Sequence, residues 1–301
     1  MPVLYILFLS FLPDTSTQFY TTDFMELGIG ARALGMGNAV VGLADDPTAF
    51  YWNPAGLARC KNPALFLMHS YDFDTIATIN TAALIYPTKQ YTLGIGFYWL
   101  SIPSIPITDS TDSAGYEVKE WINASDYIAY FSYARPIKLV DFGLNVKGIF
   151  RDWGITTAYG IETDCGLLFT TRGVNLGINF VNLLGSGIHW QDTLATNTTL
   201  PLLIKSGCSI QESIPTGKIS LCIGFATSPE KRVSQFTSLH TDTYFGAEYW
   251  WQNKFAIRVG ADRGNFSTGC GIVYRKLHFD YGIKIHPDLG LVKRLSGYIA
   301  F

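Results

Sequence analysis

The chain has 301 residues, of which 22 are Lys or Arg and 24 are Asp or Glu, so its formal net charge is −2. Charged residues make up 15 %, well below the roughly 25 % of ordinary soluble domains, and aromatic residues also make up 15 %. This composition excludes a disordered chain, because the apolar surface is ample. The near-zero net charge and the lack of a Lys/Arg cluster exclude a nucleic-acid partner. Beyond residue 12, no apolar run approaches the ~20 residues that a membrane-spanning helix needs.

Residues 3–12 form a short apolar stretch. Its length is typical of the core of a secretory signal peptide, so residues 1–20 are predicted to be one, with cleavage within 14–22. A basic residue before the stretch and an A-x-A cleavage pattern are both missing. A buried N-terminal strand is the alternative.

Residues 21–63 are predicted to form a compact plug. The part from 23 to 60 shows no alternation of apolar and polar residues but is rich in glycine and other small residues, which allow close backbone packing. A short helix is expected over 47–52, with Pro47 in its first turn and Asp46 as its cap. Asn53 before Pro54 should end that helix.

From residue 64 to 301 the dominant pattern is strict alternation, in which every second residue is apolar. In 277–286, for example, one face carries Leu277, Phe279 and Tyr281, and the other face carries His278 and Asp280. A period of two predicts β-strands. The fourteen predicted strands are 64–71, 76–87, 91–102, 126–137, 140–151, 157–170, 173–183, 200–210, 216–227, 240–251, 254–262, 265–275, 277–286 and 295–301.

The connections between these strands differ in length in a regular way. One alternate set is short, and the other contains every long connection, namely 103–125, 184–199, 228–239 and 287–294. Short turns at one end and long loops at the other are typical of outer-membrane barrels. The longest loop, 103–125, could bind a partner or could be a variable, solvated loop.

The polar residues of the strands indicate which face is inside. Acidic and basic residues are nearly balanced on that face, which predicts a polar lumen inside an apolar outer band. The luminal charged residues are expected to be Lys147, Glu162, Asp164, Lys205, Asp242, Glu248, Arg258, Asp262, Asp280 and Lys284. Aromatic girdles at the two membrane interfaces are expected from Tyr86, Tyr91, Trp99, Trp153, Tyr159, Trp250 and Trp251. The predicted fold is therefore all-β: a transmembrane, antiparallel, up-and-down β-barrel of about 14 strands with a small N-terminal luminal plug.

The last strand ends on an aromatic residue, with Leu295, Ile299 and Phe301 at alternate positions. This ending resembles the signal that the bacterial outer-membrane barrel assembly machinery reads. We therefore predict these three residues to be a C-terminal assembly signal.

Three short motifs in the plug carry a family resemblance: 30–37 (GARALGMG), 44–47 (ADDP) and 53–57 (NPAGL). In this order, ahead of a β region, they resemble the PorV/PorQ family of FadL-like outer-membrane barrels, over about residues 23–301. The resemblance implies a fourteen-stranded barrel with an N-terminal segment folded into its lumen. The residues singled out by the motifs are Gly30, Arg32, Gly35, Met36, Gly37, Asp45, Asp46, Asn53, Pro54, Ala55 and Gly56.

No constellation for catalysis, a metal or a cofactor is expected. Gly28, Gly30 and Ala33 match the dinucleotide pattern G-x-G-x-x-A, but no βαβ unit surrounds them. His278 and His286 lie on the luminal face, where hydrogen bonding is a simpler role than metal binding. The five cysteines have no metal-type spacing and are expected to be isolated thiols.

The predicted function is therefore non-enzymatic and located in the bacterial outer membrane, with membrane lipid and the assembly machinery as partners. The resemblance implies two roles. The first is an accessory of type IX-like protein secretion that binds a translocon subunit or a cargo protein. The alternative is a FadL-like channel for hydrophobic small molecules such as long-chain fatty acids. An open aqueous porin is disfavoured by the near-neutral lumen and the plug.

Overall fold

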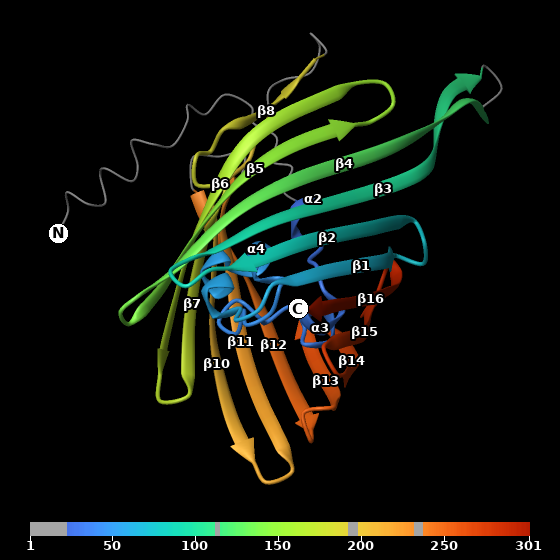
Figure 1. The fold of residues 1–301 in the computed structure, drawn as a ribbon. Coiled ribbons are helices and arrows are strands. Elements are labelled where there is room, and N and C mark those ends of the chain that lie inside the picture. The colour runs from blue at the N-terminus through green and yellow to red at the C-terminus, as the bar shows by residue number, and fades with distance from the viewer. Residues whose placement is uncertain (1–22, 112–114, 192–197, 232–236) are drawn as a thin grey trace.

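The computed structural model of the chain describes residues 23–111, 115–191, 198–231 and 237–301. The predicted signal peptide, 1–20, lies outside these residues. Four short helical segments come first and lie inside the barrel that the strands form (Figure 1). They are α2 (Asp23–Glu26), α3 (Ala31–Gly35), α4 (Ala49–Trp52) and the 3₁₀ helix η1 (Pro54–Arg59). No helix in the described part of the chain has the length and apolar character to cross a membrane.

Fourteen strands form a closed antiparallel barrel, as predicted. They pair in sequence order, except that β10 follows β7, and the barrel closes between β1 and β16. The strands are β1 (Ala64–Asp72), β2 (Ala77–Pro87), β3 (Thr92–Thr111), β4 (Gly115–Ile137), β5 (Val140–Asp152), β6 (Thr157–Thr171), β7 (Val174–Val181), β10 (Leu203–Ile214), β11 (Gly217–Lys231), β12 (Thr237–Trp251), β13 (Phe255–Asp262), β14 (Asn265–Tyr274), β15 (Leu277–His286) and β16 (Gly290–Ala300). Two further short strands, β8 (Gly187–Trp190) and β9 (Thr198–Thr199), lie beside β6 within the predicted loop 184–199. All five cysteines are free thiols.

The prediction of a loop over 103–125 is largely wrong. Strands β3 and β4 continue through most of it as a hairpin that projects beyond the neighbouring strands (Figure 1). The pairing is irregular between Ile102 and Ile105 and again after Ile107, next to Pro103 and Pro106. Proline is tolerated there because it lies at irregularities in a ribbon with free edges, where a missing N–H breaks no continuous ladder. Strands also extend into 228–239, and β16 begins at Gly290, inside the predicted connection 287–294.

The outer face of the barrel is apolar, and the predicted luminal charges are inside. Nine of the ten predicted luminal charged residues are buried, and Asp242 is half-buried. Five of the seven predicted girdle residues are exposed on the outside, but Trp250 and Trp153 are not. Trp250 faces inward, where the Arg258 guanidinium carbon lies 5.3 Å from its ring centre. Trp153 packs on Arg151, also inside the loop end of the barrel.

The prediction of a polar lumen holds for only part of the wall. Inward residues of β5 to β16 are mostly polar or charged, but those of β1 to β4 are largely apolar. The buried apolar side chains on this second part are Phe66, Met68, Ile79, Ile85, Tyr98, Leu100, Ile128 and Tyr130, and Ile149 of β5 adjoins them. They pack against the aromatic side of the plug, with Phe50 and Tyr130 in edge-to-face contact at 5.2 Å. The lumen is therefore amphipathic across its width.

We expect a charge in the middle of the outer face to destabilise the barrel. Val146 lies in the middle of β5 and is 49 % exposed, so Val146→Arg would place a guanidinium in lipid. The free energy of unfolding by urea in lipid vesicles should fall by about 2–4 kcal/mol. Ile155, in the exposed connection between β5 and β6, is the matched control, and Ile155→Arg should cost about 0–1 kcal/mol. Equal losses would contradict the assignment of Val146 to lipid.

Candidate functional site: the luminal plug

The plug lies directly on glycines of the barrel wall. A Cβ atom added at Gly260 would lie 2.2 Å from the backbone nitrogen of Gly37, and one at Gly143 would lie 2.2 Å from that of Ala55. Ten inward-facing wall glycines, spread over nine strands, have a plug atom within 3.2 Å of such a Cβ. They are Gly94, Gly96, Gly143, Gly166, Gly177, Gly207, Gly246, Gly260, Gly269 and Gly282. We call this set the glycine seam.

The seam is built from cross-strand pairs. Gly143 is opposite Gly166, Gly177 opposite Gly207, Gly246 opposite Gly260, and Gly269 opposite Gly282. A directly opposed pair without side chains leaves a flat patch of backbone on the wall. The plug backbone can therefore approach the wall backbone to contact distance.

The predicted plug glycines occupy the other side of these contacts. A Cβ at Gly37, where φ is +58°, would lie 2.5 Å from the backbone nitrogen of Ala261, and one at Gly35 would lie 3.0 Å from the Cα of Gly269. Met36 between them is fully buried. Gly56 instead packs within the plug, against Ala44, and Gly30 precedes α3 with a φ of +81°. The motif residues thus serve backbone contact more than side-chain chemistry.

Arg32 ties the plug to the polar side of the wall. Its Nη1 donates to Asp45 at 2.6 Å and to Asp46 at 2.9 Å, and its Nε and Nη2 donate to Glu248 on β12 at 2.9 and 2.8 Å. Burial lowers the pKa of the Arg32 guanidinium, but attraction by Asp45, Glu248 and Asp46 outweighs burial and holds that pKa well above its ordinary value. Three motif residues therefore form one charge cluster with the wall.

The cluster continues along the wall as alternating charges. Arg258 donates to Glu248 at 2.7 Å and lies 2.8 Å from Asp280. Nearby, Asp262 accepts from Lys284 at 2.7 Å and from the plug residue Asn38 at 3.0 Å. The sequence identified these wall charges as luminal, but not that one arginine of the plug would complete their pairing.

Asp46 and Asn53 organise the middle of the plug. The helix expected over 47–52 is shorter, because α4 begins at Ala49 with Thr48 as its N-cap. Asp46 accepts from the Thr48 N–H at 2.8 Å instead of capping the helix as predicted. Asn53 ends α4 as predicted, with φ −162° and ψ 103°.

The Asn53 side chain joins three segments. Its Oδ1 accepts from the Ala55 N–H at 3.2 Å, which caps η1, and its Nδ2 donates to the carbonyls of Val41 at 3.2 Å and Leu167 on β6 at 3.1 Å. Pro54 occupies the first turn of η1. Farther on, Arg59, which the motif search did not single out, donates to Asp141 on β5 at 2.9 Å and to Asn175 on β7 at 3.0 Å. Its basic side chain in a small-residue segment was the only sequence signal.

On the loop side of the seam, α2 packs inside the barrel against β3 and β5. The backbone carbonyl of Phe24 accepts from the Tyr98 hydroxyl at 2.8 Å, and that of Met25 accepts from the Tyr51 hydroxyl. The Arg151 guanidinium lies 4.2 Å from the centre of the Phe24 ring and is held by Asp126 at 2.6 Å. At this end of the lumen, the Phe24 ring thus packs on a paired cation of the wall.

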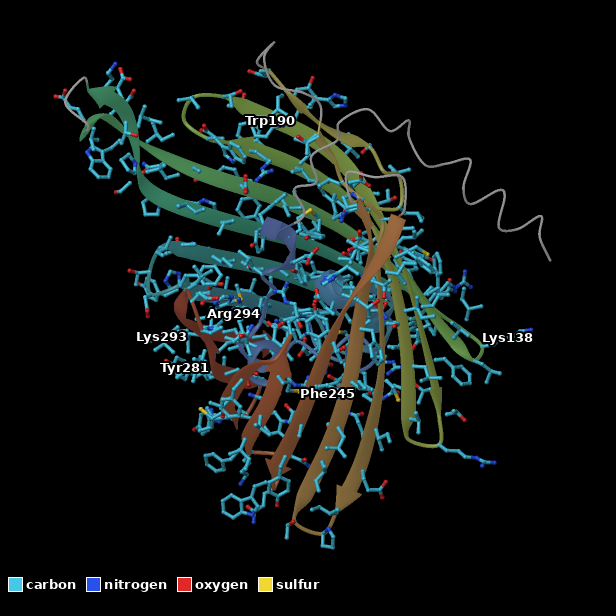
Figure 2. The ribbon with its side chains drawn as sticks, turned by 180° about the vertical axis from the view of Figure 1, so that it is seen from behind. Lys138, Trp190, Phe245, Tyr281, Lys293 and Arg294 are labelled. Atoms are coloured by element: carbon cyan, nitrogen blue, oxygen red, sulfur yellow. The ribbon has the colours of Figure 1, made fainter. Side chains whose placement is uncertain are left out.

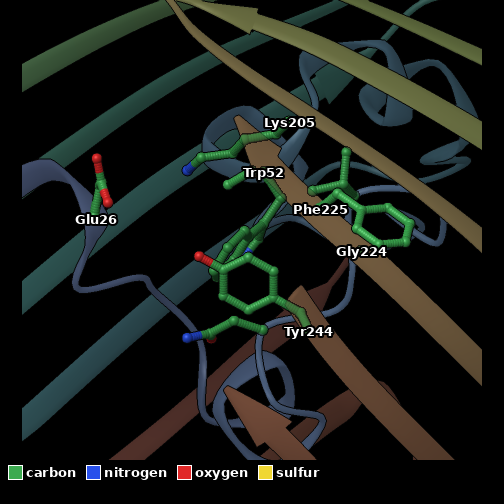
Figure 3. Close-up of a pocket in the computed structure, with 9 residues that line it drawn as sticks. Glu26, Trp52, Lys205, Gly224, Phe225 and Tyr244 are labelled. Carbon is green, nitrogen blue, oxygen red and sulfur yellow. The ribbon is translucent and has the colours of Figure 1, made fainter. Parts of the chain in front are cut away.

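A small cavity lies between the plug and β10 to β12. Its lining includes Glu26, Asn38, Trp52, Lys205 and Tyr244 (Figure 3). The Lys205 ammonium is buried and lies 5.1 and 5.4 Å from the ring centres of Tyr51 and Trp52. The cavity has a volume of about 20 Å³, which is enough for about one water molecule. This cavity therefore has no room for a ligand larger than water.

The predicted assembly residues lie at the closing seam of the barrel. Leu295 and Phe301 are 57 % and 56 % exposed, and Ile299 is half-buried. In β16, Ile299 is opposite Leu65 of β1 and Leu277 of β15. Recognition by an assembly machinery stays a prediction.

Solved hydrocarbon transport proteins share this fold. The CymD monoaromatic hydrocarbon channel aligns with a TM-score of 0.60 and 13 % identity, over 91 % of this chain and 98 % of its own. The toluene transporter TodX of Pseudomonas putida aligns with a TM-score of 0.63 and 10 % identity, over 91 % of this chain and 99 % of its own. A second TodX structure aligns with a TM-score of 0.63 and 11 % identity, over 94 % of this chain and 98 % of its own. No protein-family model and no curated protein matches the sequence.

We expect a single methyl group in the glycine seam to disturb the plug. Gly260→Ala places a carbon 2.2 Å from the Gly37 nitrogen, and overpacking of this kind costs typically about 1–3 kcal/mol. The free energy of unfolding in urea should fall by that amount. Gly148 is the matched control because it faces outward with nothing within 4 Å of its Cβ position, and Gly148→Ala should stay within about 0.5 kcal/mol of wild type. Indistinguishable losses in the two variants would contradict plug contact at Gly260.

Proposed function

We propose that this chain is a FadL-like outer-membrane channel for the uptake of hydrophobic small molecules. The observation that carries the proposal is the apolar inner face of β1 to β4. The lumen of an aqueous porin is polar, whereas this face offers a solute the same environment as a protein core. The likeness in fold to a monoaromatic hydrocarbon channel and a toluene transporter, over nearly their whole length, supports the same choice.

The outer membrane is the location that the barrel favours. Its outer face is apolar, and its turns are short at one end and longer at the other. Outer-membrane barrels have this asymmetry, with the short turns facing the periplasm. We therefore place the α2 side of the plug toward the exterior and the glycine seam toward the periplasm.

Passage through the lumen requires a part of the plug to move. The seam and the Arg32 cluster anchor the segment from α3 onward to seven or more strands, so this part is the less mobile one. The residues of α2 are held by few polar contacts, chiefly those of Tyr98 and Tyr51 to its backbone. We propose that displacement of Phe24 opens the apolar face to a solute arriving from the loop side.

We propose that a solute that has passed Phe24 next occupies the cavity at Lys205. A small apolar cluster of Val181, Leu203 and Ala226 packs with Tyr244 at its edge. A buried ammonium is costly without a charged partner, and the described residues supply Lys205 with aromatic faces but no ion pair. This chemistry suits an apolar solute with a weakly polar or acidic end, which includes the fatty acids predicted from the resemblance.

Uptake by whole cells tests the proposal, because an outer membrane is a barrier to hydrophobic solutes. Radiolabelled toluene and oleate would be presented to Gram-negative cells that lack their own FadL-like channel. Expression of the chain should raise the initial uptake rate of at least one of them. Phe24→Ala should raise that rate several-fold per folded barrel, because it removes the ring whose displacement we propose as the opening step.

Phe97→Ala is the matched control for this experiment. Phe97 precedes Tyr98 on β3 but faces outward and is 45 % exposed, so its loss should leave uptake unchanged. Rates equal to those of empty-vector cells for both wild type and Phe24→Ala would contradict the proposal. Increased entry of glucose would instead indicate an aqueous pore.

A second candidate, an accessory of type IX-like secretion, is favoured by the closed lumen. Transport is not needed if the plug only completes the barrel, and the cavity of about 20 Å³ agrees with a permanently filled interior. Affinity purification from native membranes in mild detergent should then recover a large translocon subunit or a secreted cargo protein. An unrelated barrel from the same membranes is the control, and recovery of the same proteins with both would contradict this role.

A further inference from the structure

The two ends of the barrel carry opposite charge. At the short-turn end, eight basic side chains of the described chain are exposed, against one exposed acidic side chain, Glu212. The eight are Lys61, Lys89, Arg135, Lys138, Arg172, Lys254, Arg275 and Lys276. We call them the basic ring. A net charge of −2 for the whole chain therefore conceals a strongly cationic end.

The loop end has the reverse balance. Among its described residues, six acidic and three basic side chains are exposed. The acidic ones are Asp74, Asp109, Glu117, Glu120, Asp152 and Asp288, and the basic ones are Lys119, Arg263 and Lys293. The basic ring is thus a property of one end and not of the protein surface in general.

The ring runs round the rim. Lys89 lies in the β2–β3 turn, Lys138 in the β4–β5 turn, Arg172 in the β6–β7 turn and Lys254 in the β12–β13 turn. The β14–β15 turn carries two more members, and Lys61 precedes β1. In Figure 2, Lys138 lies at the tip of its turn, away from Trp190 at the loop end. An encircling arrangement suits a partner that surrounds the barrel better than one that docks at one side.

These cations form no ion pair within the described part of the chain, although Arg275 lies over the ring of Tyr274 at 5.4 Å. Arg59 at the same end is paired with Asp141, whereas none of the eight ring residues forms an ion pair with a described carboxylate. Most luminal cations, in contrast, are paired with carboxylates inside the barrel. The charge of the basic ring is therefore available to a partner.

Exposed aromatic side chains show the depth at which the ring lies. Tyr86 and Tyr91 flank Lys89, and Trp251 and Phe255 flank Lys254, all exposed on the outer face. Tyr91 also stacks on Tyr133 at 5.7 Å, two residues before Arg135. Tyr and Trp collect where membrane meets water, so the adjacent cations lie at the level of the lipid head groups.

We propose that the basic ring binds the phosphate groups of anionic phospholipids in the leaflet that the short turns face. Each Lys or Arg near an anionic membrane surface is worth about 1 kcal/mol, or about fivefold in affinity. The encircling geometry and the neighbouring aromatic belt favour lipid over an acidic protein. The proposal is independent of what the lumen transports.

Spin-labelled lipids test the proposal on the folded full-length chain. The chain would be reconstituted in phosphatidylcholine vesicles with a trace of spin-labelled phosphatidylglycerol or, in parallel, spin-labelled phosphatidylcholine. Electron paramagnetic resonance measures the fraction of each that is immobilised at the barrel. We expect phosphatidylglycerol to be preferred by about three- to fivefold at low salt. In 1 M salt the preference should nearly vanish, because the screening length falls to about 3 Å.

Two variants of equal charge change separate the ring from general electrostatics. Lys138→Gln with Lys254→Gln removes two ring cations, and Lys119→Gln with Lys293→Gln removes two cations of the loop end. The first should reduce the preference for phosphatidylglycerol at least about twofold, and the second should leave it unchanged. Both positions in each variant are exposed, so folding should survive, and the folded fraction is checked on the same samples.

Three results would overturn the proposal. One is a wild-type barrel that immobilises the two lipids equally, and another is an equal loss in the two double variants. The third is that the two lipids are immobilised equally while wild type, but not the ring variant, retains an acidic periplasmic protein. That result would assign the ring to a protein partner. None of these depends on solute uptake.

Discussion

Contact between the plug backbone and the wall backbone is the constraint on which the rest of this structure depends. A fourteen-stranded barrel is too wide for its own inward side chains to fill, and here a segment of the chain fills it. The segment fits because side chains are missing at matched places on both surfaces, as where Gly37 meets Gly260 and Gly35 meets Gly269. Opposed glycine pairs on adjacent strands make such places flat as well as deep.

Charge and apolar packing then orient the segment that the glycines admit. Arg32 faces the acidic residue Glu248, while Phe50 faces the ring of Tyr130 on the opposite, apolar part of the wall. A buried charge is tolerated only when it is paired, and an aromatic ring gains most by leaving water. The plug therefore has one orientation that satisfies both sides. The division of the lumen that orients the plug also supplies the apolar face on which the proposed uptake depends.

Most of the barrel could be predicted from local pattern, since a period of two is a short-range property. All fourteen strands were found, and the errors fall where pattern is weak. The β3–β4 hairpin was missed because Pro103 and Pro106 interrupt the alternation, which the structure absorbs as irregular pairing. The apolar part of the lumen was missed because alternation marks only strands with one polar face. Where both faces are apolar, as around Ile85 and Ile128, the sequence does not reveal which residues point inward.

The sequence by itself determined the strand pattern, the identity of most luminal charges and the presence of a small-residue segment before the barrel, but it missed the buried charges Asp72, Asp126, Arg151 and Arg294. The features that it determined follow from chemistry that acts between near neighbours. Only the tertiary structure decided which charges pair, which glycines meet and that the short-turn rim carries an unpaired ring of cations. Those facts depend on how the chain brings together residues far apart in sequence, such as Arg32 and Glu248, which are 216 positions apart. The low charge and high aromatic content of the chain are thus explained by location. Many aromatic side chains are exposed on the outer face and others fill the lumen, while most charged side chains lie in the lumen or at the rims.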